Sequence, residues 1–191
     1  MSLPTLALSV RQPWAWAIIH AGKNFENRLK RAITLGGMKK GRICIHASKG
    51  MTRDEYESAR VTINRIAERE PLIGPNAGKT CPLPPMLVRG AIIGTVDVVA
   101  IVNEAVSPWF VGPWALVLED PEPCDPIPVA GELGYFDWQK NTGKSWSAQA
   151  IEAPLPWMTA WPGDHRPGRA PRPRQTPEPE LFAPPQQGEK P

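Results

Sequence analysis

Hydrophobic residues that alternate with polar ones predict a set of short strands along most of this chain. The clearest alternation lies in Thr5–Val10 and Gly41–Ala47, and the second segment places its two isoleucines on one face and Cys44 and His46 on the other. A long segment rich in β-branched residues follows later, with Gly94 as a bend. The predicted strands are Thr5–Val10, Phe25–Arg28, Gly41–Ala47, Ala91–Val102, Trp114–Glu119 and, as a short edge strand, Pro126–Val129.

Two segments instead carry the signals of helices. Gln12–His20 is predicted as a short helix because Pro13 suits a first turn and Gly22 suits the residue beyond the end. Thr52-Arg-Asp-Glu55 has the form of a capping box, and apolar residues at helical spacing follow until Pro71. Strands without regular β-α-β alternation favour an α+β fold. We therefore expect a small barrel of five or six mostly antiparallel strands with two or three helices.

Composition divides the chain into a folded domain and a tail. The chain has 191 residues, of which 41% are hydrophobic and 24 are prolines, and this length suits one domain. The last 30 residues hold 9 of those prolines and few large apolar side chains. We predict a domain over residues 1–161 and a disordered tail over 162–191. The four arginines between Arg166 and Arg174 make the tail either a solvated linker or a basic arm.

The apolar segments and the cysteine positions predict a cytoplasmic protein without a membrane partner. The best apolar run, Gly90–Val102, is interrupted by Asp97 and is shorter than the roughly 20 residues that a membrane helix needs. Cys44, Cys81 and Cys124 have neither a disulfide nor a zinc-site spacing. We expect reduced thiols and no cofactor, with a divalent metal only if the protein is a nuclease.

Positive charge is concentrated in one short stretch. The net charge is only +3, yet the 20 residues from Lys23 to Arg42 hold seven basic residues and one acidic one. Trp14 and Trp16 lie just before this stretch, and aromatic faces combined with cations are what single-stranded nucleic acid requires. A merely solvated face is the alternative. The basic residues are Lys23, Arg28, Lys30, Arg31, Lys39, Lys40 and Arg42.

The most specific motif lies in the first 28 residues. Ser9-Val-Arg-Gln-Pro-Trp-Ala15 is followed by Gly22-Lys-Asn-Phe-Glu-Asn-Arg28, and together they resemble the ASCH domain, a branch of the PUA-like superfamily, in its bacterial and phage type. The family pattern is a helix, then Gly, then Lys, then Glu-x-Arg at the start of a strand. The resemblance covers about residues 5–138. It implies a barrel with a cleft beside the first helix and a pocket for a nucleotide or base.

The residue types near this motif suit binding or hydrolysis. Lys23 beside Glu26 can stay charged and hold a phosphate or oxyanion, or can act as a base or nucleophile if it is desolvated. Arg28 offers a two-pronged donor to phosphate, and His46 adds a titrating group. If the protein is an enzyme, the expected catalytic residues are Lys23, Glu26 and His46. The expected ligand-binding residues are Gln12 for a base edge, Trp14 for stacking, and Arg28, Lys30, Arg31, Lys39, Lys40 and Lys49 for phosphate.

Several hypotheses about function stay open at this point. The first is binding of RNA, a nucleotide or a modified base in a basic cleft. The second is hydrolysis through Lys23 and Glu26, because the resembled family includes ribonucleases and an acylated-cytidine hydrolase. A third is an interaction module like those of eukaryotic transcription coactivators. The plain alternative is structural: Lys23, Glu26 and Arg28 would be a salt-bridge set, and His46 a half-buried histidine.

Overall fold

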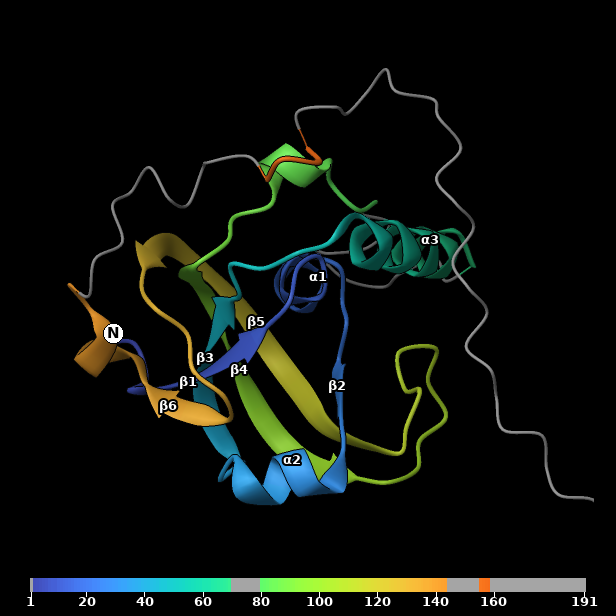
Figure 1. The fold of residues 1–191 in the computed structure, drawn as a ribbon. Coiled ribbons are helices and arrows are strands. Elements are labelled where there is room, and N and C mark those ends of the chain that lie inside the picture. Colours follow the sequence, from blue (N-terminus) through green and yellow to red (C-terminus); the bar gives the residue numbers. More distant parts are fainter. Residues whose placement is uncertain (1, 70–79, 144–154, 159–191) are drawn as a thin grey trace, which may run out of the picture.

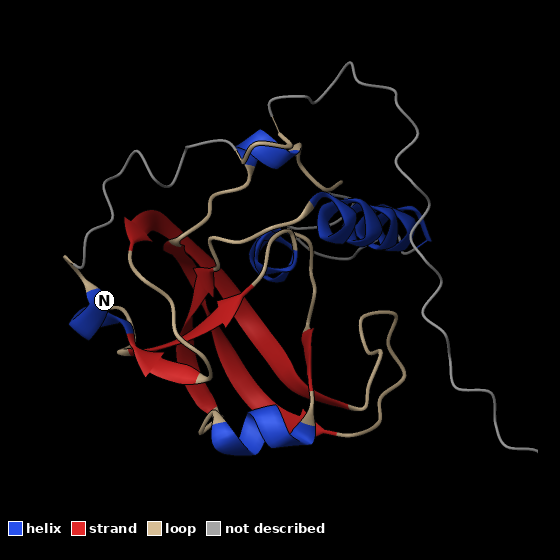
Figure 2. Cartoon of the chain, in the orientation of Figure 1, coloured by secondary structure: helices blue, strands red, loops and turns tan. Residues whose placement is uncertain are grey.

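A six-stranded, strongly curled sheet forms the centre of the molecule (Figures 1 and 2). The computed structural model describes residues 2–69, 80–143 and 155–158, so the expected tail over 162–191 lies outside the described residues. The strands are β1 (Leu6–Val10), β2 (Phe25–Arg28), β3 (Gly41–Ala47), β4 (Ala91–Val102), β5 (Trp114–Pro128) and β6 (Tyr135–Asp137). The helices are α1 (Trp14–His20), α2 (Lys30–Leu35) and α3 (Arg53–Arg69), with short 3-10 turns at Pro84–Met86 and Trp138–Asn141.

The strand order is β2-β5-β4-β3-β1-β6, and among the strands of the described residues only β1 and β3 pair in parallel. The long strands β4 and β5 carry several register irregularities, where the sheet bends. The result is a half-barrel of mostly antiparallel strands with three α-helices. This confirms the predicted α+β fold.

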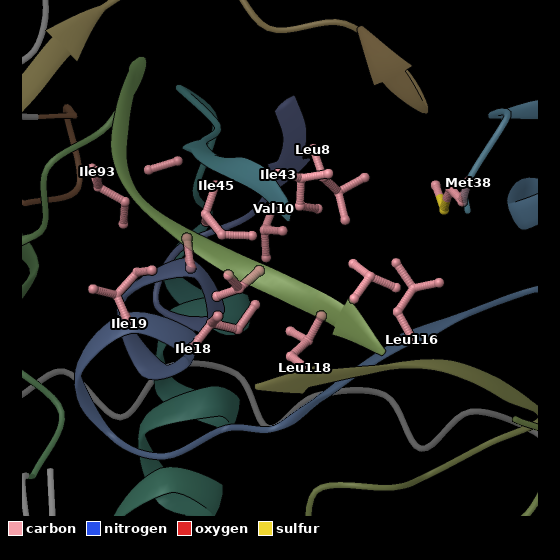
Figure 3. Packing of buried hydrophobic residues seen from close by; sticks show 14 of the residues in the cluster. Leu8, Val10, Ile18, Ile19, Met38, Ile43, Ile45, Ile93, Leu116 and Leu118 are labelled. Atoms are coloured by element: carbon pink, nitrogen blue, oxygen red, sulfur yellow. The ribbon is translucent and has the colours of Figure 1, made fainter. Parts of the chain in front are cut away.

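Helix α1 lies between the sheet and helix α3 (Figure 1). On the sheet side, Ile18 and Ile19 belong to the same buried cluster as Ile43 and Ile45 of β3 and Ile93 of β4 (Figure 3). On the other side, Ala17 and Ala21 contact a second cluster that includes residues of α3. Because apolar residues cover two faces of so short a helix, its position is fixed by packing rather than by helical propensity.

The 15-residue strand β5 differs from the expectation. The prediction of a separate edge strand at Pro126–Val129 was wrong, because β5 runs without interruption to Pro128 and pairs with β4 there. Strand β2 pairs only with the first part of β5, at Trp114–Val117. Among the described strands, β4 alone pairs with the proline-containing part of β5, and that single-sided pairing tolerates residues without an N–H donor.

Helix α2 and strand β6 had no sequence signal of their own. Strand β6 has three residues and pairs with β1, and α2 has six residues without a side-chain cap. Elements this short depend on contacts with their neighbours, which the local pattern does not contain.

Candidate functional site

Three adjoining hollows form a groove beside α1. The first, named here the Trp14 cavity, has a volume of about 290 Å³ and is lined by residues of α1, β2 and the 103–113 loop. The central hollow has a volume of about 510 Å³ and shares Trp14, Glu26 and Asn27 with the first. The third, the His46 hollow, has a volume of about 360 Å³ and shares Ser9 and Ser48 with the central one. A ligand can therefore contact more than one hollow at once.

Local backbone geometry brings Lys23, Glu26 and Arg28 together. Gly22 adopts a φ of +68, which a side chain would disfavour, and the N–H of Lys23 then bonds back to the carbonyl of Ala17 at 3.1 Å. The chain continues directly into β2, where residues two apart share a face. The helix end and the start of the strand thus place three charged side chains on one wall of the groove.

These three side chains form a continuous ion-pair set. Lys23 Nζ lies 2.8 Å from Glu26 Oε2 and also donates to the carbonyl of Phe25. Arg28 Nε lies 3.1 Å from Glu26 Oε1, and Arg28 Nη2 donates to the carbonyl of Ser9 at 2.7 Å. The side chains of Lys23 and Glu26 are only 4% and 9% exposed, whereas that of Arg28 is 22% exposed. Since an ammonium has three N–H donors, one further bond from Lys23 to a ligand oxygen fits this geometry.

Glu26 is ionised near neutral pH. Burial by itself would raise the pKa of this carboxyl, but the charges of Lys23 and Arg28, with their hydrogen bonds, outweigh burial and hold the pKa below its usual value. A buried carboxylate fixed by two cations is a rigid hydrogen-bond acceptor. The Glu26 carboxylate can therefore accept a hydrogen bond from an N–H group of a ligand in the charged form that it already has.

Aromatic side chains line the same cavity from two directions. Trp14 opens α1, and Lys23 Nζ lies 5.8 Å from the centre of its ring. Trp109 lies on the 103–113 loop, and two hydrogen bonds with Asn27 hold this loop. Asn27 Nδ2 donates to the Trp109 carbonyl at 2.9 Å, and Asn27 Oδ1 accepts from the N–H of Val111 at 3.0 Å. The role of Asn27 was missed in the sequence, where it is only a polar residue between the two charged residues of the motif.

His46 lies in a different hollow from Lys23 and Glu26. Its side chain is buried, with Nδ1 3.0 Å from Ser9 Oγ and Nε2 3.0 Å from the carbonyl of Val129. Burial lowers the pKa of His46 to about 4, although the bond to Val129 opposes the shift. The ring is therefore neutral near pH 7. Nε2 carries the proton donated to the carbonyl, and Nδ1 accepts from the hydroxyl.

The remaining predicted ligand-binding residues are spread over the molecule. Gln12 is only 1% exposed, donates to the carbonyl of Val88 at 2.6 Å and accepts from the N–H of Trp16 at 3.0 Å, so it ties the start of α1 to the segment that precedes β4. Lys49 lines the His46 hollow. The exposed group of Lys30, Arg31, Lys39 and Lys40 lies on and just after α2, at the end of the half-barrel away from α3 (Figure 1).

Two further arginines alter the expected charge pattern. Arg11, which was not predicted, lines the central hollow and pairs with Glu55 at 2.8 Å, with about half of its side chain exposed. Arg42, counted in the basic stretch, instead pairs with Asp97 at 3.2 Å and Glu122 at 2.8 Å. The groove therefore presents three cations, Arg11, Arg28 and Lys23, each paired with a carboxylate.

The acidic, histidine and cysteine side chains of the described residues can be considered as metal ligands and as nucleophiles. No cluster of three or more His, Cys, Asp or Glu side chains suited to a metal ion occurs among the described residues. The three cysteines are free, and burial raises the pKa of Cys44 to about 12 and that of Cys81 to about 11, so both thiols stay protonated. Within the described ranges, no helix has the length and apolar character needed to cross a bilayer.

Comparison of the chain with protein-family models and with curated proteins gives no match.

Proposed function

We propose that this protein binds single-stranded RNA or a nucleotide and holds one base in the Trp14 cavity. The observation that carries the proposal is the joint presence of an aromatic ring, Trp14, and a fixed carboxylate, Glu26, on the walls of a cavity of about 290 Å³. A base can stack on an indole ring whatever its sequence context. A carboxylate accepts hydrogen bonds from the amino group of a base, as it does from cytosine N4.

The central hollow gives room for the sugar and phosphate that follow such a base. Arg28 and Arg11 line it, and guanidinium groups donate two parallel bonds to phosphate. The exposed lysines on and after α2 add positive charge at the end of the half-barrel away from α3. The resemblance to the ASCH domain belongs to the proposal as well, because the Lys and Glu of the motif are residues that line the Trp14 cavity.

A hydrolase that uses Lys23, Glu26 and His46 together is the weaker candidate. Lys23 and Glu26 are paired in one hollow, whereas His46 is bonded to Ser9 and Val129 in another. General acid–base partners must reach the same reacting atoms. Binding without hydrolysis through these three residues therefore fits the geometry better.

The proposal is tested by fluorescence anisotropy with labelled ten-nucleotide RNAs of each base. Replacing Trp14 by Ala should weaken binding about 5- to 150-fold, because stacking on an aromatic side chain contributes about 1–3 kcal/mol per base. Trp16→Ala is the matched control, since Trp16 lies on the same helix and packs against His20 at a tilt rather than lining the cavity. Free mononucleotides should compete with the labelled RNA.

Salt dependence tests the phosphate contacts separately. The logarithm of the affinity should fall with the logarithm of the salt concentration by about 0.7 for each phosphate neutralised on a single strand. Changing Lys39 and Lys40 together to Glu should reduce both the affinity and this slope. Equal affinity of the wild type and Trp14→Ala, or no binding of any RNA or nucleotide, would contradict the proposal.

A further inference from the structure

We propose that Ser9 and His46 form a nucleophile–base pair that cleaves carboxylic esters in the His46 hollow. This activity is distinct from base binding in the Trp14 cavity and does not depend on it. It uses a serine that the ASCH-like motif does not assign to any chemistry.

The pair is built by the parallel pairing of β1 and β3. Ser9 and His46 occupy directly opposed positions in the two strands, so their side chains leave the sheet on the same face. Ser9 Oγ lies 3.0 Å from His46 Nδ1, within the range for a nucleophile and its base. The arrangement follows from strand register and does not require a flexible loop to move.

The imidazole is held in the orientation and tautomer that the reaction needs. The carbonyl of Val129 accepts from Nε2 at 3.0 Å, which leaves the Nδ1 lone pair directed at the serine hydroxyl. Phe136 packs edge-on against the ring, with the ring centres 5.8 Å apart. Both contacts restrict rotation of the ring, as the third member of a catalytic triad does.

The hydroxyl lies at a junction that a substrate can occupy. Ser9 lines both the His46 hollow of about 360 Å³ and the central hollow of about 510 Å³. Gly131 passes directly over the pair, and a Cβ at this position would lie 2.6 Å from Ser9 Oγ. The same Cβ would lie even closer to His46 Cε1, so the backbone of Gly131 packs closely on the imidazole and a larger residue would displace the ring.

The reaction needs no oxidant and no metal. Ser9 Oγ attacks the ester carbonyl carbon while its proton passes to His46 Nδ1, and this proton then goes to the departing alcohol as the ester C–O bond breaks. Water attacks the acyl-serine, gives a proton to Nδ1, and that proton returns to Ser9 Oγ as the carboxylic acid leaves. The products are one alcohol and one carboxylic acid.

The low basicity of the buried ring indicates which esters react. A pKa of about 4 for His46 keeps Nδ1 free of protons at neutral pH but makes it a weak base. Esters with good leaving groups should therefore react, and covalent modification of Ser9 should be easier to detect than turnover.

The experiment treats the full-length protein at pH 7.5 with a fluorophosphonate probe. Attack by Ser9 forms an Oγ–P bond and releases fluoride, so the mass increases by one phosphonyl group that peptide mapping assigns. Wild type should be labelled at Ser9, and Ser9→Ala should lose at least nine-tenths of the label. Ser58→Ala removes an exposed hydroxyl from α3, outside the hollow, and should be labelled as wild type is.

A second measurement uses p-nitrophenyl acetate, whose hydrolysis should fall at least tenfold in Ser9→Ala and stay unchanged in Ser58→Ala. His46→Gln should also reduce labelling at least tenfold, and circular dichroism checks that this variant folds. Labelling and RNA anisotropy are read separately on the wild-type protein, so failure of this proposal is distinguishable from failure of the binding proposal. An unlabelled wild type, or label at another residue with Ser9 unmodified, would overturn the assignment.

Discussion

Acid should destabilise this protein through His46 before it affects the ion-pair set of the groove. His46 is 2% exposed in the folded protein, and burial, only partly opposed by its bond to Val129, lowers its pKa from 6.5 to about 4. Between these two values the unfolded chain binds a proton that the folded chain does not bind. The free energy of unfolding therefore falls as the pH falls from about 6.5 towards about 4.

The size of this effect follows from the two pKa values. One pKa unit corresponds to 1.36 kcal/mol, so a change from 6.5 to about 4 amounts to about 3 kcal/mol. The ring is contacted by Ser9, Val129 and Phe136, none of which has an ionisable group in this pH range. The charged residues that line the same hollow are Lys49 and Glu132.

Glu26 acts over a lower pH range. Its folded pKa lies below 4.5, so the stability it provides is complete above pH 4.5 and is lost as the pH falls below that value. The contribution of His46 is largely lost before that of Glu26 begins to change. The two effects can therefore be separated in one pH series.

The assay is urea denaturation followed by tryptophan fluorescence, at half-unit steps from pH 8 to pH 4. Wild type should lose about 3 kcal/mol over this range through His46, and His46→Gln, although less stable at pH 7.5, should lack this component. His20→Gln is the control, because it removes a histidine outside the His46 hollow. Parallel pH profiles for wild type and His46→Gln would show that the buried ring is not responsible.

Three further changes test the groove. Lys23→Met should lower the free energy of unfolding by about 3–5 kcal/mol, because it leaves Glu26 buried beside a single cation. In urea titrations, the double variant with Glu26→Gln should lose less stability than the sum of the two single losses. Strict additivity of the two losses would contradict the pairing. Asn27→Ala removes both hydrogen bonds to the 103–113 loop, so the free energy of unfolding should fall by about 1–3 kcal/mol. The same variant should bind RNA more weakly in anisotropy assays. Unchanged affinity would show that the loop does not shape the cavity. Gly131→Ala should lower the free energy of unfolding by about 1–3 kcal/mol by crowding Ser9, and it should slow fluorophosphonate labelling. A variant that melts and reacts as wild type does would exclude the close approach of Gly131 to Ser9.

Local spacing in the sequence determined the charged wall of the groove and several of the elements around it. A period of two identified β3, and a proline at the start with a glycine after the end identified α1. The proximity of Lys23, Glu26 and Arg28 was predictable for the same reason, because contacts over two or three residues follow from backbone geometry alone. The function assigned to these residues stays a prediction, since the same spacing serves a salt-bridge set or a binding wall.

Tertiary structure alone decided what the charged wall faces. Asn27 holds a loop about 80 residues further along the chain, and His46 takes its two partners from Ser9 and from Val129. Such contacts depend on strand order and register, which no local pattern encodes. The strand order also separates His46 from Lys23, because β5 and β4 lie between β2 and β3, although sequence analysis had grouped the two residues as one set. Residue types and short-range spacing specified the chemical groups, whereas long-range strand pairing determined which of those groups share a hollow.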